Sequence, residues 1–392
     1  MEKESSSAEK YHAKTLKGLE PYLAKELMAL GAERTEEVNR GVNFYGGRAL
    51  MYRANLASRL SLRILFPLFG FRATDDSELY RRTRRYDWSQ HLDNRKTFAI
   101  DGVVHSPHFP HSHFAVQRVK DAIADRFREL THLRPSVNRN HPDILINLHI
   151  SGDRVTLSLD TSGSSLHKRG YRSGNFEAPL NEVLAAGMIA ISGWNGDTPF
   201  LDPMCGSGTL AIEAALMARN IPPGIYRKEF GFEHWKDFDR DLLEHVVRSL
   251  PGEREVKVPI VARDKDPEAV ALTLGQLRRM ELADAVKVEQ GDFEEAPGSD
   301  PGTTLMINPP YGARLKSPDL GSLYRMMGSV LKHRHPGTDV WILSSSKKGL
   351  SGIGLRPESK RVLYNGSLEC VFAHFRTFAG TWKERKERES RL

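Results

Sequence analysis

Hydrophobic and polar positions alternate in short blocks over the first 66 residues. Strand-like runs at 11–16 and 42–45 are each followed by apolar residues at helical spacing, over 18–30 and 48–66. Pro67 is expected to end the second of these helices, because proline cannot continue an α-helix. The strand–helix–strand–helix order predicts a small α+β domain over residues 1–66.

A second block of similar character covers residues 67–165. Strand-like runs occur at 68–74 and 97–104, and an amphipathic helix is expected at 114–130. A hairpin is expected at 144–159, with its turn at Ser151-Gly152-Asp153. These elements predict a second α+β domain.

Longer strand and helix segments alternate from residue 166 to about Thr377, the pattern of an α/β domain with a doubly wound sheet. We expect this domain to cover residues 166–381. The last residues, 382–392, are nearly all charged, and a disordered tail is expected there.

Composition narrows the class of protein. No run of 18 apolar residues exists, and the polar N-terminus lacks the apolar core of a secretory signal. The two cysteines, Cys205 and Cys370, lie far apart, so a disulfide framework is not expected. A cytoplasmic protein without a membrane partner is therefore predicted.

Positive charge is concentrated in the N-terminal part. Residues 1–172 hold 28 Lys+Arg against 20 Asp+Glu, a net +8, whereas the remainder holds 29 against 30, a net −1. Such an asymmetry suits a basic nucleic-acid surface, although a solvated basic face would look the same. The arginine run beside Tyr86 and Trp88 favours phosphate contact and base stacking. The candidate RNA-binding residues are Arg81, Arg82, Arg84, Arg85, Lys168, Arg169 and Arg172.

A glycine-rich turn links a strand to a helix in the C-terminal part. Gly206, Gly208 and Ala211 fit the G-x-G-x-x-G/A pattern, in which glycines let the backbone approach a ligand at a helix N-terminus. That pattern alone also suits a dinucleotide dehydrogenase. The preceding Asp202 instead favours a cationic, amine-bearing ligand, S-adenosylmethionine, over a pyrophosphate. The candidate cofactor residues of this turn are Asp202, Pro203, Gly206, Ser207, Gly208 and Thr209.

Two further acidic residues follow later strands of the same part. Asp264, after a strand at 259–262, is a candidate to hold the ribose hydroxyls, while Asp266 is expected to cap the next helix. After a strand at 286–289, Asp292 is a candidate acceptor for an adenine amine, with Phe293 against the ring.

The segment Asn308-Pro309-Pro310-Tyr311 follows a strand at 304–307. A base amine is a poor nucleophile, because its lone pair is delocalised into the ring. The Asn308 side-chain oxygen and the Pro309 carbonyl could accept its two N–H groups. Pro310 stiffens the loop, and Tyr311 could stack on a base turned out of its helix. These four residues are the candidate catalytic set. We expect them to speed methyl transfer mainly by orienting the base amine toward the methyl group.

The segments 202–209 and 308–312 together resemble those of bacterial THUMP-containing rRNA guanine-N2 methyltransferases of the RlmL type, often labelled N6-adenine-specific DNA methylases. The resemblance extends to 167–172, 178–182 and the aromatic segment before Trp235. It implies a ferredoxin-like domain at 1–66, a THUMP RNA-binding domain at 67–165 and a Rossmann-like class I methyltransferase domain at 166–381.

The resemblance also implies S-adenosylmethionine as cofactor and the exocyclic N2 amine of a guanine in 23S rRNA as target. Fused members carry a second methyltransferase domain, so the guanine-N2 activity alone is expected here. Arg263 departs from the family pattern, which has a small residue before the acid. A tRNA guanine-N2 enzyme or an adenine-N6 methylase would share these motifs.

The four histidines at 105–113 match no standard zinc spacing, and no metal is expected.

Overall fold

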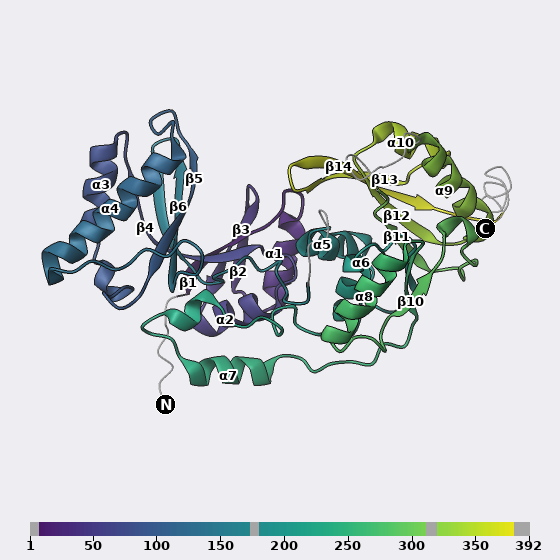
Figure 1. Cartoon of the computed structure of the whole chain (residues 1–392), viewed down its shortest axis with the longest axis horizontal. Coiled ribbons are helices and arrows are strands. Elements are labelled where there is room, and N and C mark those ends of the chain that lie inside the picture. The colour runs from purple at the N-terminus through teal and green to yellow at the C-terminus, as the bar shows by residue number, and fades with distance from the viewer. Residues whose placement is uncertain (1–7, 173–179, 311–319, 380–392) are drawn as a thin grey trace. The chain divides into compact units, whose positions relative to one another are not determined.

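The computed structural model describes residues 8–172, 180–310 and 320–379, which form two compact units. Within these residues, the first unit takes 8–15, 23–166 and 227–250, and the second takes the rest (Figure 1). The units therefore do not follow the chain in a simple order, because residues 227–250 return to the first unit from within the C-terminal part.

One seven-stranded sheet runs through the first unit, in the order β2-β3-β1-β4-β7-β6-β5. Neighbouring strands are antiparallel except β5 and β6, which are parallel. The strands are β1 (Glu9–Lys14), β2 (Arg34–Val38), β3 (Gly41–Gly46), β4 (Arg63–Arg72), β5 (Phe98–His105), β6 (Ile144–Ser151) and β7 (Arg154–Asp160). The two N-terminal blocks of the sequence thus share a single continuous sheet, joined where β4 pairs with β7.

Helices of the first unit pack against the sheet or against one another. They are α1 (Glu20–Ala29, most of which belongs here), α2 (Arg48–Ala57), α3 (Asp76–Arg85), α4 (Ser112–Thr131) and α7 (Arg240–Ser249), with 3-10 turns η1 (Trp88–Gln90) and η2 (Gly231–His234). Helices α3 and α4 lie side by side, and α4 lies next to β5 (Figure 1). Val119, Ile123 and Phe127 of α4 are buried against this end of the sheet, as the amphipathic spacing predicted.

The predicted helix at 48–66 is wrong in its second half. Helix α2 ends at Ala57, and Glu26 accepts the backbone N–H groups of Arg59 and Leu60, at 2.8 and 3.3 Å. The chain then enters β4, which continues through Pro67. Proline is tolerated there because the register with β7 shifts between Pro67 and Phe69, and a bulge needs no donor at that point.

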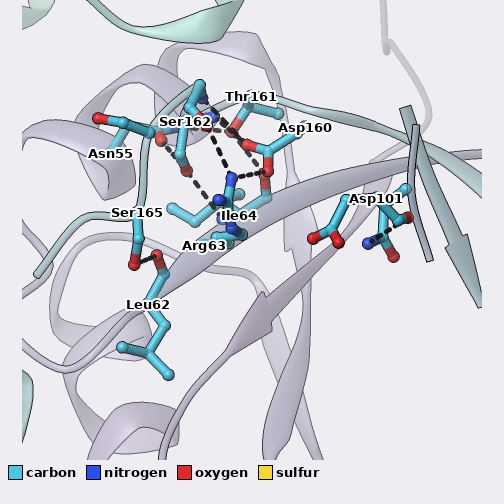
Figure 2. A network of polar contacts seen from close by, with 12 residues as sticks. Asn55, Leu62, Arg63, Ile64, Asp101, Asp160, Thr161, Ser162 and Ser165 are labelled. Atoms are coloured by element: carbon cyan, nitrogen blue, oxygen red, sulfur yellow. Dashed lines mark hydrogen bonds and ion pairs between the residues drawn. The ribbon is translucent and has the colours of Figure 1, made fainter. Parts of the chain in front are cut away.

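A buried polar network joins α2, β4 and the end of β7 (Figure 2). The Arg63 guanidinium lies 2.5 Å from the Asp160 carboxylate, and it also donates to the carbonyl of Gly163. Asn55 donates to Thr161 at 2.7 Å and accepts from Ser162 at 2.8 Å. All of these side chains except the partly exposed Arg63 are buried, and each is bonded to another. The network therefore fixes the path of the chain as it leaves the sheet.

The returning segment 227–250 is held in the first unit by aromatic and polar contacts. The Phe232 ring stacks on Tyr52 with centroids 4.4 Å apart, and Arg48 forms an ion pair with Asp237. Arg227 donates to the carbonyls of 162, 164 and 165, at 2.8 to 3.1 Å. Since Phe232 is fully buried, this segment is part of the core of the first unit.

The second unit is built on a doubly wound sheet, as predicted, in the order β10-β9-β8-β11-β12-β14-β13. Pairs are parallel from β10 to β12, and β14 is antiparallel to both of its neighbours. The strands are β8 (Phe200–Asp202), β9 (Ile260–Asp264), β10 (Lys287–Gln290), β11 (Thr304–Ile307), β12 (Asp339–Ser344), β13 (Ser359–Asn365) and β14 (Leu368–Arg376).

Helices cover both faces of this sheet. They are α5 (Glu182–Ser192), α6 (Thr209–Ala218), α8 (Pro267–Arg279), α9 (Leu320–Arg334) and α10 (Lys347–Gly352), with the 3-10 turn η3 (Phe293–Glu295). Helices α5, α6 and α8 lie on one side, and α9 and α10 on the other (Figure 1). Helices α5 and α6 are buried almost all round, which matches their predominantly apolar sequences.

Domain boundaries at 66/67, 165/166 and 381/382 stay predictions, and the charged tail at 382–392 lies outside the described residues. No helix in the described part of the chain is long and apolar enough to cross a membrane.

Candidate cofactor and amine-binding site

From β8 the chain continues to β9 and β10 on one side of that strand, and it then crosses to β11 and β12 on the other side. The direction in which strands are added therefore reverses next to β8. In doubly wound sheets, ligands bind at such a point, beyond the carboxyl ends of the strands. Asp202 and Asp264 end β8 and β9, and Asn308 directly follows β11. The predicted polar residues therefore gather at one edge of the sheet.

A cavity of about 290 Å³ lies at this edge. Of the predicted cofactor residues, all but Gly208 line it, and so do Asn308 and Pro310 of the predicted catalytic set. Its lining residues are Leu180, Asp202, Pro203, Met204, Cys205, Gly206, Ser207, Thr209, Leu210, Asp264, Lys265, Asp292, Phe293, Asn308, Pro310, Leu323 and Met326. The candidate set did not include the apolar lining residues Leu180, Leu323 and Met326. Leu180 lies in the segment 178–182, to which no role was given, and Leu323 and Met326 belong to α9 and to no motif.

The glycine turn has the conformation that its residue types require. Gly206 and Gly208 have φ values of +53° and +73°, which L side chains rarely adopt. The N–H of Gly206 donates to Asp264 at 2.8 Å, and its carbonyl accepts from the Thr273 hydroxyl at 3.0 Å. A Cβ on Gly208 would lie 2.5 Å from the Thr273 methyl group. The turn is therefore pinned from both sides by β9 and α8.

The two strand-end carboxylates have different surroundings. Asp202 is 1% exposed, and burial raises the pKa of its carboxyl well above the usual range. The nearby charge of Asp264 adds to this rise in pKa, whereas a long hydrogen bond from the Met204 N–H opposes it. Asp264 is half-buried and accepts backbone N–H groups from both Gly206 and Asp266. Asp266 caps α8 through the N–H of Glu268, as predicted. A buried carboxyl facing a cavity favours a cationic group in that cavity.

Asp292 and Phe293 form another wall. Asp292 caps η3 through the N–H of Glu294, at 3.1 Å. Phe293 is buried, and its ring stacks on His335 with centroids 5.6 Å apart. Burial lowers the pKa of His335 to about 4, so its imidazole is neutral at physiological pH. This stack gives the wall a flat apolar backing.

Asn308 carries an unused acceptor. Its Oδ1 is buried, and no donor among the described residues bonds to it. Buried polar atoms without a partner are rare in folded proteins, and one beside a cavity points to a ligand donor. Pro309 is buried and Pro310 lines the cavity, whereas Tyr311 lies outside the described residues.

The arginine run forms the last two turns of α3. Arg81, Arg82 and Arg85 are exposed, and Arg84 pairs with Glu129 at 3.1 Å. The expectation that Trp88 stacks on RNA bases is wrong, because Trp88 is fully buried in the core of the first unit and donates its indole N–H to the carbonyl of Thr83.

The candidate RNA-binding arginines of the 167–172 motif are placed differently from the prediction. Arg169 is 1% exposed and pairs with the buried Glu213, so the prediction that it contacts RNA is wrong: its guanidinium cannot reach a phosphate. Arg172 is half-buried and pairs with Glu182. Only Lys168 of the three is exposed. The described residues contain no group of three or more His, Cys, Asp or Glu side chains placed to hold a metal ion.

Comparison with protein-family models matches three consecutive parts of the chain. Residues 10–65 match the RlmL ferredoxin-like domain, 73–160 the THUMP domain, and 169–374 the RMKL-like methyltransferase domain. These matches confirm the fold predicted for each part.

Known proteins resemble the chain over nearly its whole length. A Synechocystis sp. protein with the provisional name RNA methyltransferase is 36% identical over 95% of this chain and 98% of its own. A ribosomal RNA large subunit methyltransferase K/L of Photobacterium profundum is 37% identical over 95% of this chain, which spans about half (54%) of that relative.

Solved structures agree with these matches. The crystal structure of SMU.472, provisionally assigned as a methyltransferase and complexed with SAH, matches with a TM-score of 0.85 and 29% identity, covering 96% of this chain and all of that one. A Listeria monocytogenes protein described as an N6-adenine-specific DNA methylase matches with a TM-score of 0.84 and 29% identity, over 94% and 96% of the two chains. The chain therefore belongs to the RMKL-like methyltransferase family, with ferredoxin-like and THUMP domains ahead of the methyltransferase domain.

Proposed function

We propose that this protein is an S-adenosylmethionine-dependent RNA methyltransferase that methylates the exocyclic N2 amine of a guanine in 23S rRNA. The observation that carries the amine chemistry is the buried Oδ1 of Asn308, which has no partner among the described residues and lies beside the cavity at the switch point of the sheet.

The cavity suits S-adenosylmethionine in charge and shape. The buried Asp202 would face the cationic methionine part, Asp264 would hold the ribose hydroxyls, and Asp292 would accept from the adenine amine, with Phe293 against the ring. The glycine turn leaves open space at Gly206, where a Cβ would meet nothing within 4 Å. The cofactor supplies an electrophilic methyl group on a sulfonium.

The chain's own residues orient the acceptor amine. Asn308 Oδ1 and the Pro309 carbonyl would accept the two N–H groups, which draws the nitrogen toward a tetrahedral shape with its lone pair available. Preorganised acceptors of this kind act without reorganising during the reaction.

RNA is the substrate class favoured by the THUMP match and by the net +8 of residues 1–172. The choice of 23S rRNA rests on the names of the K/L relatives. A tRNA guanine-N2 activity and an adenine-N6 activity are the alternatives, and a cytoplasmic location is part of the proposal.

The test is mass spectrometry of nucleosides from 23S rRNA and tRNA of a strain lacking the gene. Loss of one N2-methylguanosine from 23S rRNA, restored by the wild-type gene, is the expected result. Loss of a tRNA methylguanosine or of an N6-methyladenosine, with 23S rRNA intact, would contradict the proposed substrate.

Cofactor binding is expected to release a proton. Burial holds the pKa of Asp202 well above its usual range in the free protein, and a cationic ligand beside it would favour the carboxylate. The affinity should therefore rise with pH while Asp202 titrates. Calorimetry of S-adenosylhomocysteine in two buffers of different ionisation enthalpy measures this proton. The Asp202→Asn variant should bind S-adenosylhomocysteine more weakly and release no proton.

The wild-type protein should not bind NAD. Tight NAD binding without S-adenosylhomocysteine binding would reverse the cofactor assignment.

The exposed arginines of α3 are expected to contact phosphates. Replacing Arg81, Arg82 and Arg85 by glutamate should weaken RNA binding and flatten its salt dependence, by up to about 0.7 to 0.9 in logarithmic slope for each lost contact. Cofactor affinity should not change. Anisotropy of a labelled rRNA fragment over a salt series is the measurement. An unchanged salt dependence of RNA affinity would show that these arginines form a solvated helix face that does not contact RNA.

A further inference from the structure

The 167–172 motif turns its arginines inward against the methyltransferase core. Arg169 Nε and Nη2 lie 3.3 and 3.5 Å from the two carboxylate oxygens of Glu213, and both side chains are almost fully buried. Glu213 stands one helical turn after Thr209 on α6. A buried ion pair thus ties the motif to the helix that follows the glycine turn.

Arg172, three residues later, reaches two walls of the cofactor cavity. Its Nη2 donates to the carbonyl of Leu180 at 2.5 Å and lies 3.5 Å from the Thr209 hydroxyl. Its Nε pairs with the carboxylate of Glu182, which is 2% exposed and begins α5. Leu180 and Thr209 both line the cavity. One planar guanidinium therefore joins the chain before α5 to the start of α6.

The local backbone is built for this arrangement. Gly170 has a φ of +107°, and a Cβ there would lie 2.6 Å from the carbonyl oxygen of Tyr226. Only glycine fits, and the turn it makes lets both arginines face inward. Lysine could satisfy the charge of Glu182, but a single ammonium cannot match the fork that reaches all three acceptors.

We propose that Arg172 is a positioning residue of the cofactor site: it fixes the distance between Leu180 and Thr209 and so shapes the cavity for S-adenosylmethionine. This inference rests on the proposed function, and it replaces the expectation that Arg172 contacts RNA.

The test uses the full chain with Arg172→Lys. By calorimetry, the Kd for S-adenosylhomocysteine should rise about tenfold or more, the scale of one lost hydrogen bond to a charged group. The KM for S-adenosylmethionine should rise in step, while kcat at saturating cofactor stays near that of the wild type. Affinity for an rRNA fragment should not change. Arg219→Lys, at the other end of α6 in a surface pair with Asp284, is the matched control and should leave the Kd unchanged.

An unchanged Kd in Arg172→Lys would overturn the inference, and so would a loss of RNA affinity without any loss of cofactor affinity. If Arg172→Lys does not fold, Arg172→Met with Glu182→Gln leaves no buried unpaired charge and serves for the same measurements. Wild-type protein that binds S-adenosylhomocysteine but methylates no RNA would refute the proposed function while leaving this inference testable by Kd alone.

Discussion

Asn308→Ala is expected to remove methyl transfer almost completely, by at least about a hundredfold in kcat, the scale for losing one preorganised polar group in an active site. The Oδ1 of Asn308 has no partner among the described residues, so the substitution breaks no hydrogen bond from that atom to them. The melting temperature should therefore change little. Single-turnover transfer of a labelled methyl group to rRNA from the deletion strain is the measurement.

Asn195→Ala serves as the matched control, because Asn195 is an exposed loop residue of the same unit that bonds to Asp197. It should transfer methyl groups at the wild-type rate. The affinity of Asn308→Ala for S-adenosylhomocysteine should stay near normal, since the residue is assigned to the base and not to the cofactor. Full activity in Asn308→Ala would remove the proposed amine-binding mechanism.

Arg63→Ala is expected to destabilise the protein by about 3–5 kcal/mol, because it leaves the buried Asp160 carboxylate without its partner. Burial already raises the pKa of Asp160, and Arg63 opposes that rise. Without Arg63 the pKa rises further. The protonated acid carries no charge to bury, so the loss of stability should shrink as the pH falls. Urea denaturation at several pH values measures both effects.

The other end of the same strand provides the control. Arg72 forms a surface ion pair with Asp153 at 3.0 Å, and Arg72→Ala should cost under about 1 kcal/mol. Arg63→Met combined with Asp160→Asn should recover most of the lost stability, since asparagine can still accept the N–H groups of Ser162 and Gly163. Equal losses in Arg63→Ala and Arg72→Ala would show that burial does not decide the strength of this pair.

Sequence patterns predicted the second unit well because its chemistry is local. The glycine turn, the strand-end acids and the Asn308 segment are each read from adjacent residues, and strand order then brings them to one cavity. The carboxyl ends of parallel strands meet by geometry, so motif spacing along the chain does not matter.

Patterns misled where long-range contacts decide the structure. Leu56, Leu60 and Ile64 have helical spacing. Glu26, from another helix, nevertheless accepts backbone N–H groups after Ala57, and Ile64 instead pairs with β1 as part of β4. A basic motif likewise indicated an RNA surface at 167–172. Burial of Arg169 depends on Glu213, a partner 44 residues away, and no local signal reveals it.

The return of residues 227–250 to the first unit has a consequence for biosynthesis. A ribosome releases the chain from its N-terminus, and domains usually fold as they emerge. Here β7 is complete at Asp160, but Phe232, which packs on Tyr52, is made some seventy residues later. In the interval the glycine turn and α6 of the second unit have already been synthesised. The first unit therefore cannot be completed before part of the second has been made, and the surface around Tyr52 stays uncovered until residues 227–250, the last part of the first unit, are synthesised.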